Sequence, residues 1–252
     1  LAEGLEKLNI VKPMEEIPID GIMSDAGKVF AALMKFGGFP EPFLKQSEKD
    51  WRRWHSNRLE RLIKEDIRDL ENLRDLSAMQ ILVDILPSKV GSLLSLNSLR
   101  EDISVAHKTI ANWMDILERF YYHFRIYPYA HKKIKSLKKE PKLYLWDWSE
   151  INDNDGARLE NIVASHLLKL CHYLHDVDGY KTDLHFLRDI DGREVDFLVT
   201  SDGKPWFAVE VKSSAKDISK TLNYFGAKLD IPFLYQVVDE RDDHQAIQHR
   251  HT

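Results

Sequence analysis

The sequence predicts a protein of mixed class, α+β or α/β, in which a helical N-terminal part precedes a mixed sheet flanked by helices. Two patterns predict this class. Apolar residues recur at helical spacing through the first half of the chain, whereas after about residue 156 short apolar strands occur together with two helical segments. The chain has 252 residues, 43% of them hydrophobic, which is enough to bury the cores of two or three modules.

Composition limits the environment in which the chain works. The net charge is −5, and the single Cys171 excludes an internal disulfide bond. No stretch approaches the roughly 20 consecutive apolar residues that span a bilayer. We therefore expect a soluble protein of a reducing compartment, the cytoplasm, with no membrane partner. Because the chain begins with Leu1 and not with methionine, we expect it to be part of a longer protein.

Residues 1–60 are predicted to form a helix followed by a linker. Phe30, Leu33 and Met34 repeat at helical spacing. The helix is expected to stop, and the linker to begin, at a group of residues that break helices: Gly37, Gly38, Pro40 and Pro42.

Residues 61–148 are predicted to form a winged-helix-like domain. Two helices with regular apolar spacing are expected between about residues 51 and 86, the second ending before Pro87. Two more helices, split near Ser104, form a helix-turn-helix, and β-rich runs on both sides of residues 131–142 would form the wing. The last helix is expected to turn three residues inward and three outward: Ile110, Met114 and Leu117 inward, Lys108, Thr109 and Asn112 outward.

The segment of residues 131–142 is strongly basic, with six lysines against one glutamate, so that its local charge is about +5 on an acidic protein. One interpretation is a solvated loop, and the other is a wing that contacts nucleic-acid phosphates. The candidate nucleic-acid-binding residues are Lys132, Lys133, Lys135, Lys138 and Lys139. The helix-turn-helix leaves the same choice open, because this packing also occurs in helical domains that bind protein.

The third predicted domain, residues 149–252, has the order helix, three strands, helix, strand. One side of its first helix is expected to be apolar, formed by Leu159, Val163, Leu167, Leu170 and Leu174. The later elements are expected over residues 183–189, 194–200 and 206–212 for the three strands, 215–230 for the helix and 232–238 for the last strand. Because the last strand follows a helical crossover, we expect it to join the mixed sheet parallel to a neighbour.

Two of these strands carry charged residues in otherwise apolar runs: Asp196 in one, Glu210 and Lys212 in the next. A two-residue turn would set Asp196 opposite Val209, whereas a loop over residues 201–205 sets Asp196 opposite Glu210. We expect the longer loop, because Pro205 cannot donate a hydrogen bond within the ladder. Opposed residues have Cβ atoms about 4.5–5.5 Å apart, so the two carboxylates would repel each other unless a cation lay between them.

This pair predicts a site for Mg²⁺, or Mn²⁺, which binds one or two carboxylates and keeps waters for phosphate oxygens. The predicted metal ligands are Asp196, Glu210 and Glu160, which lies at the border of its helix's apolar side. Asp196, Glu210 and Lys212 are the predicted catalytic residues. Lys212 would orient the nucleophile or stabilise negative charge, and as a general base it would need a lowered pKa. The alternative is an ordinary ion-pair cluster, with Glu160 on the surface.

At these residues the sequence resembles the PD-(D/E)xK nuclease superfamily, which has the restriction-endonuclease-like fold. Asp196, the run Glu210-Val211-Lys212 and the preceding helical Glu160 match its motif, and residues 156–240 match the αβββαβ order of its core. The resemblance implies a metal-dependent nuclease site, although the motif alone is short.

A longer stretch, about residues 15–252, resembles the C-terminal part of a family of archaeal and bacterial AAA-type ATPases. The matching segments include "GGFPEPFL", "KTIANWMDILERF", "LENIVASHLL" and "EVDFLV". The resemblance implies that an ATPase domain precedes residues 1–60, which would be a helical remnant and linker. The sequence has no GxxxxGK[ST] phosphate-binding motif, so ATP hydrolysis is not expected of this chain.

From these features we expect the chain to be the C-terminal module of an ATPase. We expect this module to hydrolyse phosphodiester bonds in DNA with Mg²⁺. Two alternatives remain. The module could bind nucleic acid or a partner protein and regulate the ATPase without cutting, or it could serve as an oligomerisation scaffold. The terminal His244, His249 and His251 are expected to lie in a frayed tail.

Overall fold

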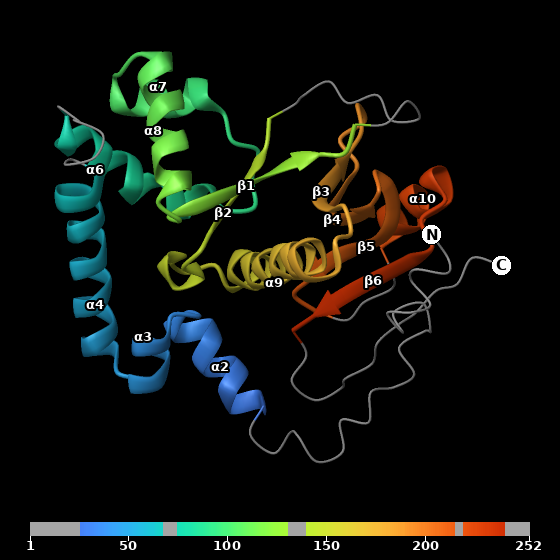
Figure 1. Cartoon of the computed structure of the whole chain (residues 1–252), viewed down its shortest axis with the longest axis horizontal. Coiled ribbons are helices and arrows are strands. Elements are labelled where there is room, and N and C mark those ends of the chain that lie inside the picture. Colours follow the sequence, from blue (N-terminus) through green and yellow to red (C-terminus); the bar gives the residue numbers. More distant parts are fainter. Residues whose placement is uncertain (1–25, 68–74, 131–139, 215–218, 240–252) are drawn as a thin grey trace.

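The computed structural model describes residues 26–67, 75–130, 140–214 and 219–239 (Figure 1). Within these residues one mixed sheet has six strands in the order β2-β1-β3-β4-β5-β6. The strands are β1 His123–Pro128, β2 Lys142–Leu145, β3 Thr182–Arg188, β4 Glu194–Ser201, β5 Lys204–Lys212 and β6 Phe233–Val238. The helices are α2 Ala26–Phe36, α3 Pro40–Lys45, α4 Glu48–Arg61, α6 Leu76–Ile85, α7 Leu96–Ile103, α8 His107–Arg119, α9 Asp155–Asp178 and α10 Lys220–Leu229. Short helical turns are η1 Leu62–Ile67, η2 Leu86–Lys89 and η3 Trp148–Glu150.

Strand pairing confirms the predicted element order of the C-terminal part. β3, β4 and β5 pair antiparallel in sequence, whereas β6 follows α10 and pairs parallel with β5, as predicted. The two strands on either side of the basic segment, β1 and β2, pair antiparallel, and β1 also pairs parallel with β3. They therefore extend the same sheet, which continues across the domain boundary predicted at residue 148.

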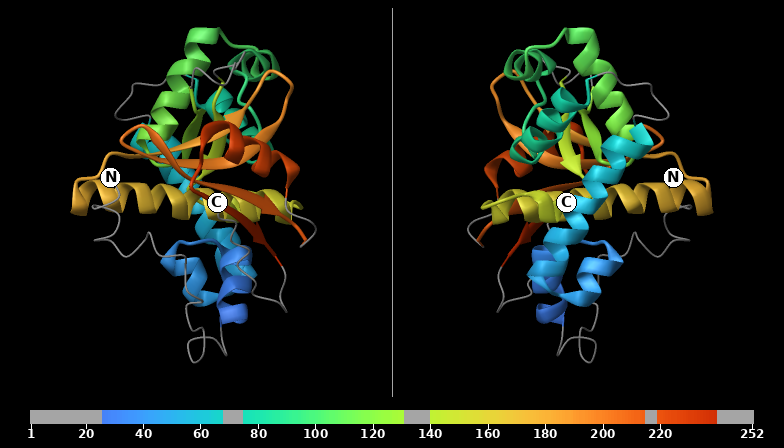
Figure 2. Two further views of the ribbon diagram at one scale, coloured as in Figure 1. Left: turned by 90° about the vertical axis from the view of Figure 1, so that its right-hand side faces the viewer. Right: turned by 90° about the vertical axis from the view of Figure 1, so that its left-hand side faces the viewer.

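Helices cover both faces of the sheet (Figure 1). α10 packs on one face, where Leu222 and Phe225 meet apolar residues of β4 and β5. α9 packs on the other face, and α2 and α3 lie below α9 in both views of Figure 2, while most of the sheet lies above it. No helix of the described part of the chain is long and apolar enough to cross a bilayer.

The apolar side predicted for α9 was only partly right. Leu159 and Leu174 are buried, but the other three predicted residues, Val163, Leu167 and Leu170, are half-buried. The reason is Asn161, whose side chain bonds both the backbone N and the backbone O of Leu145, at 2.8 and 2.7 Å. A fully buried amide must satisfy both its donor and its acceptor, so this contact turns the Asn161 side of the helix toward β2.

The N-terminal helices follow the predicted pattern with one correction. α2 ends before Gly37, whose φ is +80°, a conformation that only glycine adopts without strain. Pro40 and Pro42, which we predicted to open a linker, begin α3 instead. Proline is favoured in the first turn of a helix, because an amide hydrogen there has no partner within the helix.

The predicted helix-turn-helix is present as α7 and α8, which meet at Ser104 with φ +61°. The three inward residues are fully buried: Ile110, Met114 and Leu117. Lys108 and Asn112 are exposed as predicted, but Thr109 is half-buried. The candidate nucleic-acid-binding lysines, Lys132 to Lys139, fall outside the described residues, so the basic wing stays a prediction.

His123 on β1 couples the stability of this fold to pH. Its ring is fully buried, and its Nε2 donates a hydrogen bond to the carbonyl of Met114 at 3.0 Å. Burial disfavours the charged ring and lowers the pKa of His123 from 6.5 to about 4. The unfolded chain thus takes up a proton at this residue near pH 6.5, whereas the folded protein does so only near pH 4.

We predict that His123→Gln removes part of the acid sensitivity of the protein. As pH falls from 6.5 to 4, the unfolded state gains a proton that the folded state cannot take, so the wild type loses about 3 kcal/mol of stability at this residue. Urea unfolding of both proteins across this range measures the difference. Equal pH slopes for wild type and variant would contradict the assignment, whatever the stability of the variant at neutral pH.

Candidate active site

The turn between β4 and β5 differs from the predicted loop. It is a two-residue turn at Asp202 and Gly203, with φ of +50° and +73°. Ser201 pairs with Lys204, and Pro205 takes part in the ladder. The expected five-residue loop was therefore wrong, because an Asp-Gly pair readily adopts the two positive φ angles that a tight hairpin requires.

The register that places the two acids together is nevertheless present, for another reason. β5 carries a bulge at Trp206, which shifts the pairing by one residue, so that Val199 pairs with Phe207 and Phe197 with Val209. The pairing ends at Phe197 and Val209, and one further step in the same register would set Asp196 opposite Glu210.

A second bulge gives Asp196 its orientation. In the pairing with β3, Leu187 faces Val195 while His185 faces Leu198, so β4 has one extra residue in this stretch. Here Asp196 Oδ2 accepts a hydrogen bond of 2.8 Å from the backbone N of Val211 on β5. The carboxylate thus lies at the β4–β5 junction, as bulged residues beside functional sites commonly do.

Lys142 supplies the main positive charge of the cluster, and sequence reasoning missed it. Its side chain is 2% exposed, and its ammonium lies 2.7 Å from Glu194 Oε1, 3.3 Å from Glu160 Oε1 and 3.4 Å from Asp196 Oδ1. Burial alone would lower the pKa of Lys142, but the three carboxylates outweigh it and raise the pKa. The sequence held one signal that Lys142 is buried. Lys142 opens the apolar run "KLYL", whereas the lysines before it stand in a polar run.

Glu160 reaches the cluster from α9, as predicted, and is held there by two donors. Tyr144 donates its hydroxyl to Glu160 Oε1 at 2.7 Å, beside the Lys142 contact. Burial, together with the Asp196 carboxylate, raises the pKa of Glu160 against the opposing charge of Lys142. Gly91 lies against the same carboxylate, because a Cβ at that position would stand 3.2 Å from both carboxylate oxygens.

Glu210 and Lys212 form the other part of the cluster. Lys212 Nζ lies 2.5 Å from Glu210 Oε1, while Glu210 Oε2 is buried with no hydrogen-bond partner among the described residues. Burial and the neighbouring Asp196 carboxylate raise the pKa of Glu210. Although burial opposes it, the bond to Glu210 raises the pKa of Lys212, so its ammonium stays protonated. Lys212 can therefore orient groups or stabilise negative charge, but it is not suited to act as a general base.

The cluster as a whole keeps an excess of negative charge. Four carboxylates, on Glu160, Glu194, Asp196 and Glu210, face two ammonium groups, on Lys142 and Lys212. Arg188, which is partly exposed, adds an outer ion pair of 2.5 Å to Glu194. The inner balance of about −2 matches the charge of one divalent cation.

A cleft of about 430 Å³ opens at one edge of the cluster, where Glu160 and Lys212 line it but Asp196 and Glu210 do not. It is lined by Glu160, by Lys212 and Ser213 after β5, by Gly91 and Ser92, and by Asn154 at the start of α9. The oxygens of the three predicted metal ligands, Glu160, Asp196 and Glu210, do not all come within 4.8 Å of one another.

Comparison with known families divides the chain at the start of α9. Residues 27–152, half of the chain, match the family described as Domain of unknown function (DUF8612). The chain belongs to the DUF8612 family. Residues 155–251 match a second family, Domain of unknown function (DUF4143). The DUF8612 part contributes Lys142, Tyr144 and Gly91 to the cluster, and the DUF4143 part contributes its acids and Lys212.

One curated relative is the Uncharacterized protein MJ1637 of Methanocaldococcus jannaschii, which is 28% identical over 180 residues. The alignment covers 65% of this chain and 36% of the relative, so the chain spans about a third of that protein's length. No solved structure matches the chain.

We predict that Lys142→Met destabilises the DUF8612 protein by about 3–5 kcal/mol, because it leaves buried carboxylates without their cation. Mg²⁺ or Mn²⁺ should restore part of this loss and stabilise the variant more than the wild type. Urea unfolding with and without the metal measures both effects.

Lys204→Met is the matched control, because Lys204 is exposed on the same sheet and its replacement should change stability by less than about 0.5 kcal/mol. A loss for Lys142→Met as small as that of the control would show that the buried ammonium does not hold the cluster together.

Proposed function

We propose that the chain is a nuclease-like module with the restriction-endonuclease-like fold, which hydrolyses phosphodiester bonds in DNA with Mg²⁺ or Mn²⁺. The observation that carries the proposal is the cluster of Asp196, Glu210 and Lys212, in which Asp196 bonds the backbone of Val211 and Lys212 both pairs with Glu210 and lines the cleft. The order α9-β3-β4-β5-α10-β6, with β6 parallel to β5, supports the αβββαβ core.

The donor groups fit a divalent cation of the hard type. Glu210 Oε2 is a buried oxygen without a hydrogen-bond partner in the described residues, next to the Asp196 carboxylate. Mg²⁺ needs only one or two carboxylates and completes its coordination with waters. Asp196 and Glu210 would hold the ion, and Glu160 would join them only by leaving Lys142. When bound, such a cation lowers the pKa of a water ligand and polarises a phosphate.

The protein's own groups would position the substrate. Lys212 lines the cleft and stays protonated, so its ammonium can bind a non-bridging phosphate oxygen and stabilise the charge that develops there. Lys142 and Tyr144 hold Glu160 in place behind the cleft. The choice of DNA rests on the predicted winged helix and the basic segment of residues 131–142, and the link to an N-terminal ATPase rests on the sequence resemblance; both stay predictions.

One observation favours a second function, a module that binds nucleic acid or a partner protein without cutting. The Lys142 ammonium already contacts three of the four carboxylates and offsets one of their negative charges without a metal ion. A cluster stabilised by its own lysine can be structural, and the same cleft would then only bind.

Cleavage of plasmid and single-stranded DNA in Mg²⁺, Mn²⁺ or EDTA tests the proposal. We expect metal-dependent cleavage that falls at least about 100-fold in Asp196→Asn and in Lys212→Ala, because each removes a group that acts on the reacting phosphate. Circular dichroism establishes that the variants fold.

Asp202→Asn is the matched control. It removes one negative charge from the same hairpin, at the turn, where asparagine tolerates the positive φ, and it should leave cleavage unchanged. Cleavage that persists in EDTA or in Asp196→Asn would refute the nuclease proposal. Salt-dependent DNA binding without turnover would establish the second function in its place.

A further inference from the structure

A second group of potential metal ligands lies in the DUF8612 part. His55 projects from α4, Asp147 precedes η3, and Glu150 lies at the end of η3. One nitrogen of His55 and one oxygen of each acid all lie within 4.8 Å of one another, a convergence that the predicted nuclease ligands lack. Asp147 and Glu150 are buried, with side chains 1% and 3% exposed.

Two buried atoms of these residues have no hydrogen-bond partner in the described residues: His55 Nδ1 and Asp147 Oδ2. His55 Nδ1 stands 3.8 Å from Glu150 Oε1, which is too far for a hydrogen bond. Two metal–ligand bonds of about 2.1 Å span up to about 4.2 Å, so one ion fits between His55 Nδ1 and Glu150 Oε1. Burying His55 Nδ1 and Asp147 Oδ2 without a bond costs free energy of folding, and a bound cation would satisfy both atoms.

The remaining atoms of the three residues are fixed by neighbours, as in established metal centres. Asp147 Oδ1 accepts bonds from the backbone N and the hydroxyl of Ser149, at 3.1 and 2.6 Å, which leaves Oδ2 free to face the group. Tyr122 donates its hydroxyl to Glu150 Oε2 at 2.6 Å. The His55 ring stacks on Trp51, with 5.5 Å between ring centroids.

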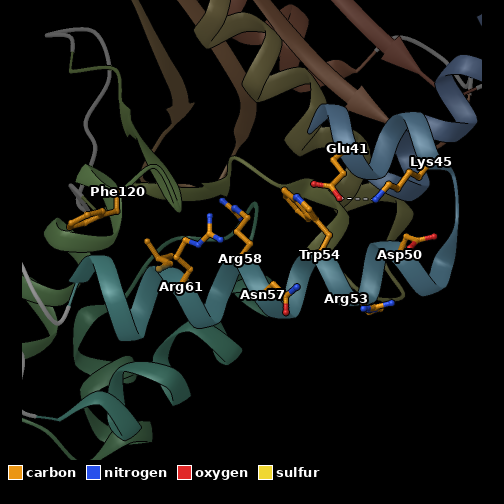
Figure 3. Close-up of a pocket in the computed structure, with 10 residues that line it drawn as sticks. Glu41, Lys45, Asp50, Arg53, Trp54, Asn57, Arg58, Arg61 and Phe120 are labelled. Atoms are coloured by element: carbon orange, nitrogen blue, oxygen red, sulfur yellow. Dashed lines mark hydrogen bonds and ion pairs between the residues drawn. The ribbon is translucent and has the colours of Figure 1, made fainter.

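Arg58 is the cation now in contact with this group. Its Nη1 lies 3.0 Å from Glu150 Oε1 and 3.9 Å from Asp147 Oδ2. The same guanidinium stacks over Phe39, 4.6 Å from the ring centroid, and Arg58 lines a cleft of about 580 Å³ beside α4 (Figure 3). Arg58 therefore has both a stacking partner and open space, so it can release Glu150 Oε1 to an incoming ion.

We infer that His55, Asp147 and Glu150 form a site for Zn²⁺, which ties α4 to the segment after β2. A set of one imidazole nitrogen and two carboxylate oxygens suits Zn²⁺. Mg²⁺ fits less well, because it prefers a shell of oxygen ligands to an imidazole nitrogen. The ion would join α4 of the N-terminal helices to the segment that follows β2.

Isothermal titration of the whole chain with Zn²⁺, after chelator treatment and desalting, tests the inference. We expect one bound equivalent whose affinity falls at least tenfold in His55→Gln. We expect a similar loss in Tyr122→Phe, which keeps the ring but removes the bond that orients Glu150. Zn²⁺ should also raise the unfolding temperature of the wild type but not that of His55→Gln. A cooperative unfolding transition in the same measurement shows that the variant is folded.

Three matched variants separate this site from other zinc ligands. His107→Gln removes an exposed histidine of α8 and should bind as the wild type does. Asp196→Asn, and replacement of His244, His249 and His251 by glutamine, should also leave the bound equivalent in place. Loss of zinc binding in Asp196→Asn or in the triple histidine variant would assign the zinc to another site and overturn the inference. Unchanged zinc affinity in both His55→Gln and Tyr122→Phe would overturn it as well.

Discussion

The charge on which this structure depends is the buried ammonium of Lys142. An ammonium with 2% exposure is stable only if its lost hydration is replaced, and here three carboxylates replace it. The dependence is mutual, since Glu160, Glu194 and Asp196 are themselves largely shielded from water and would repel one another without the lysine. One ion cluster thus fixes β2, α9 and β4 relative to each other.

This cluster explains why the two family segments fold together although their sequence matches are separate. The DUF8612 part supplies the lysine and the DUF4143 part supplies the acids, so neither could bury its share of the charge alone. The backbone repeats the same connection, because β1 of the first part pairs with β3 of the second. A boundary between sequence families is therefore no boundary in the sheet or in its electrostatics.

Local patterns predicted the order of elements well, because alternation and helical spacing depend on neighbouring residues. The helix-turn-helix, the antiparallel strands and the parallel last strand all follow from such patterns. The meeting of Asp196 and Glu210 was predicted for the wrong reason. The extra residue lies in a bulge at Trp206 and not in the loop, and a bulge leaves no mark in the order of apolar and polar residues.

Long-range partners were the part that sequence could not supply. Lys142 was grouped with the lysines before it, because its acid partners lie 18 to 54 positions away in the sequence. The same holds for His55, which lies more than 90 residues from Asp147 and Glu150. A signal was present in the run "WDWSE", where two acids stand among large aromatic residues, an unusual setting for charges that face solvent.

The chemistry open to the cleft depends on which cation balances the acids that Lys142 leaves unneutralised. The raised pKa of Lys212 means that this residue cannot accept a proton from water, so it cannot generate the nucleophile for hydrolysis. In the proposed nuclease, Asp196 and Glu210 would hold a divalent ion, which would supply the acidification of water that Lys212 does not. Lys142 does not exclude such an ion, because it contacts Asp196 through Oδ1 while Glu210 Oε2 remains without a partner in the described residues. Under the proposed function, a nuclease and a binding module would therefore differ in whether this pair of carboxylates binds a divalent ion.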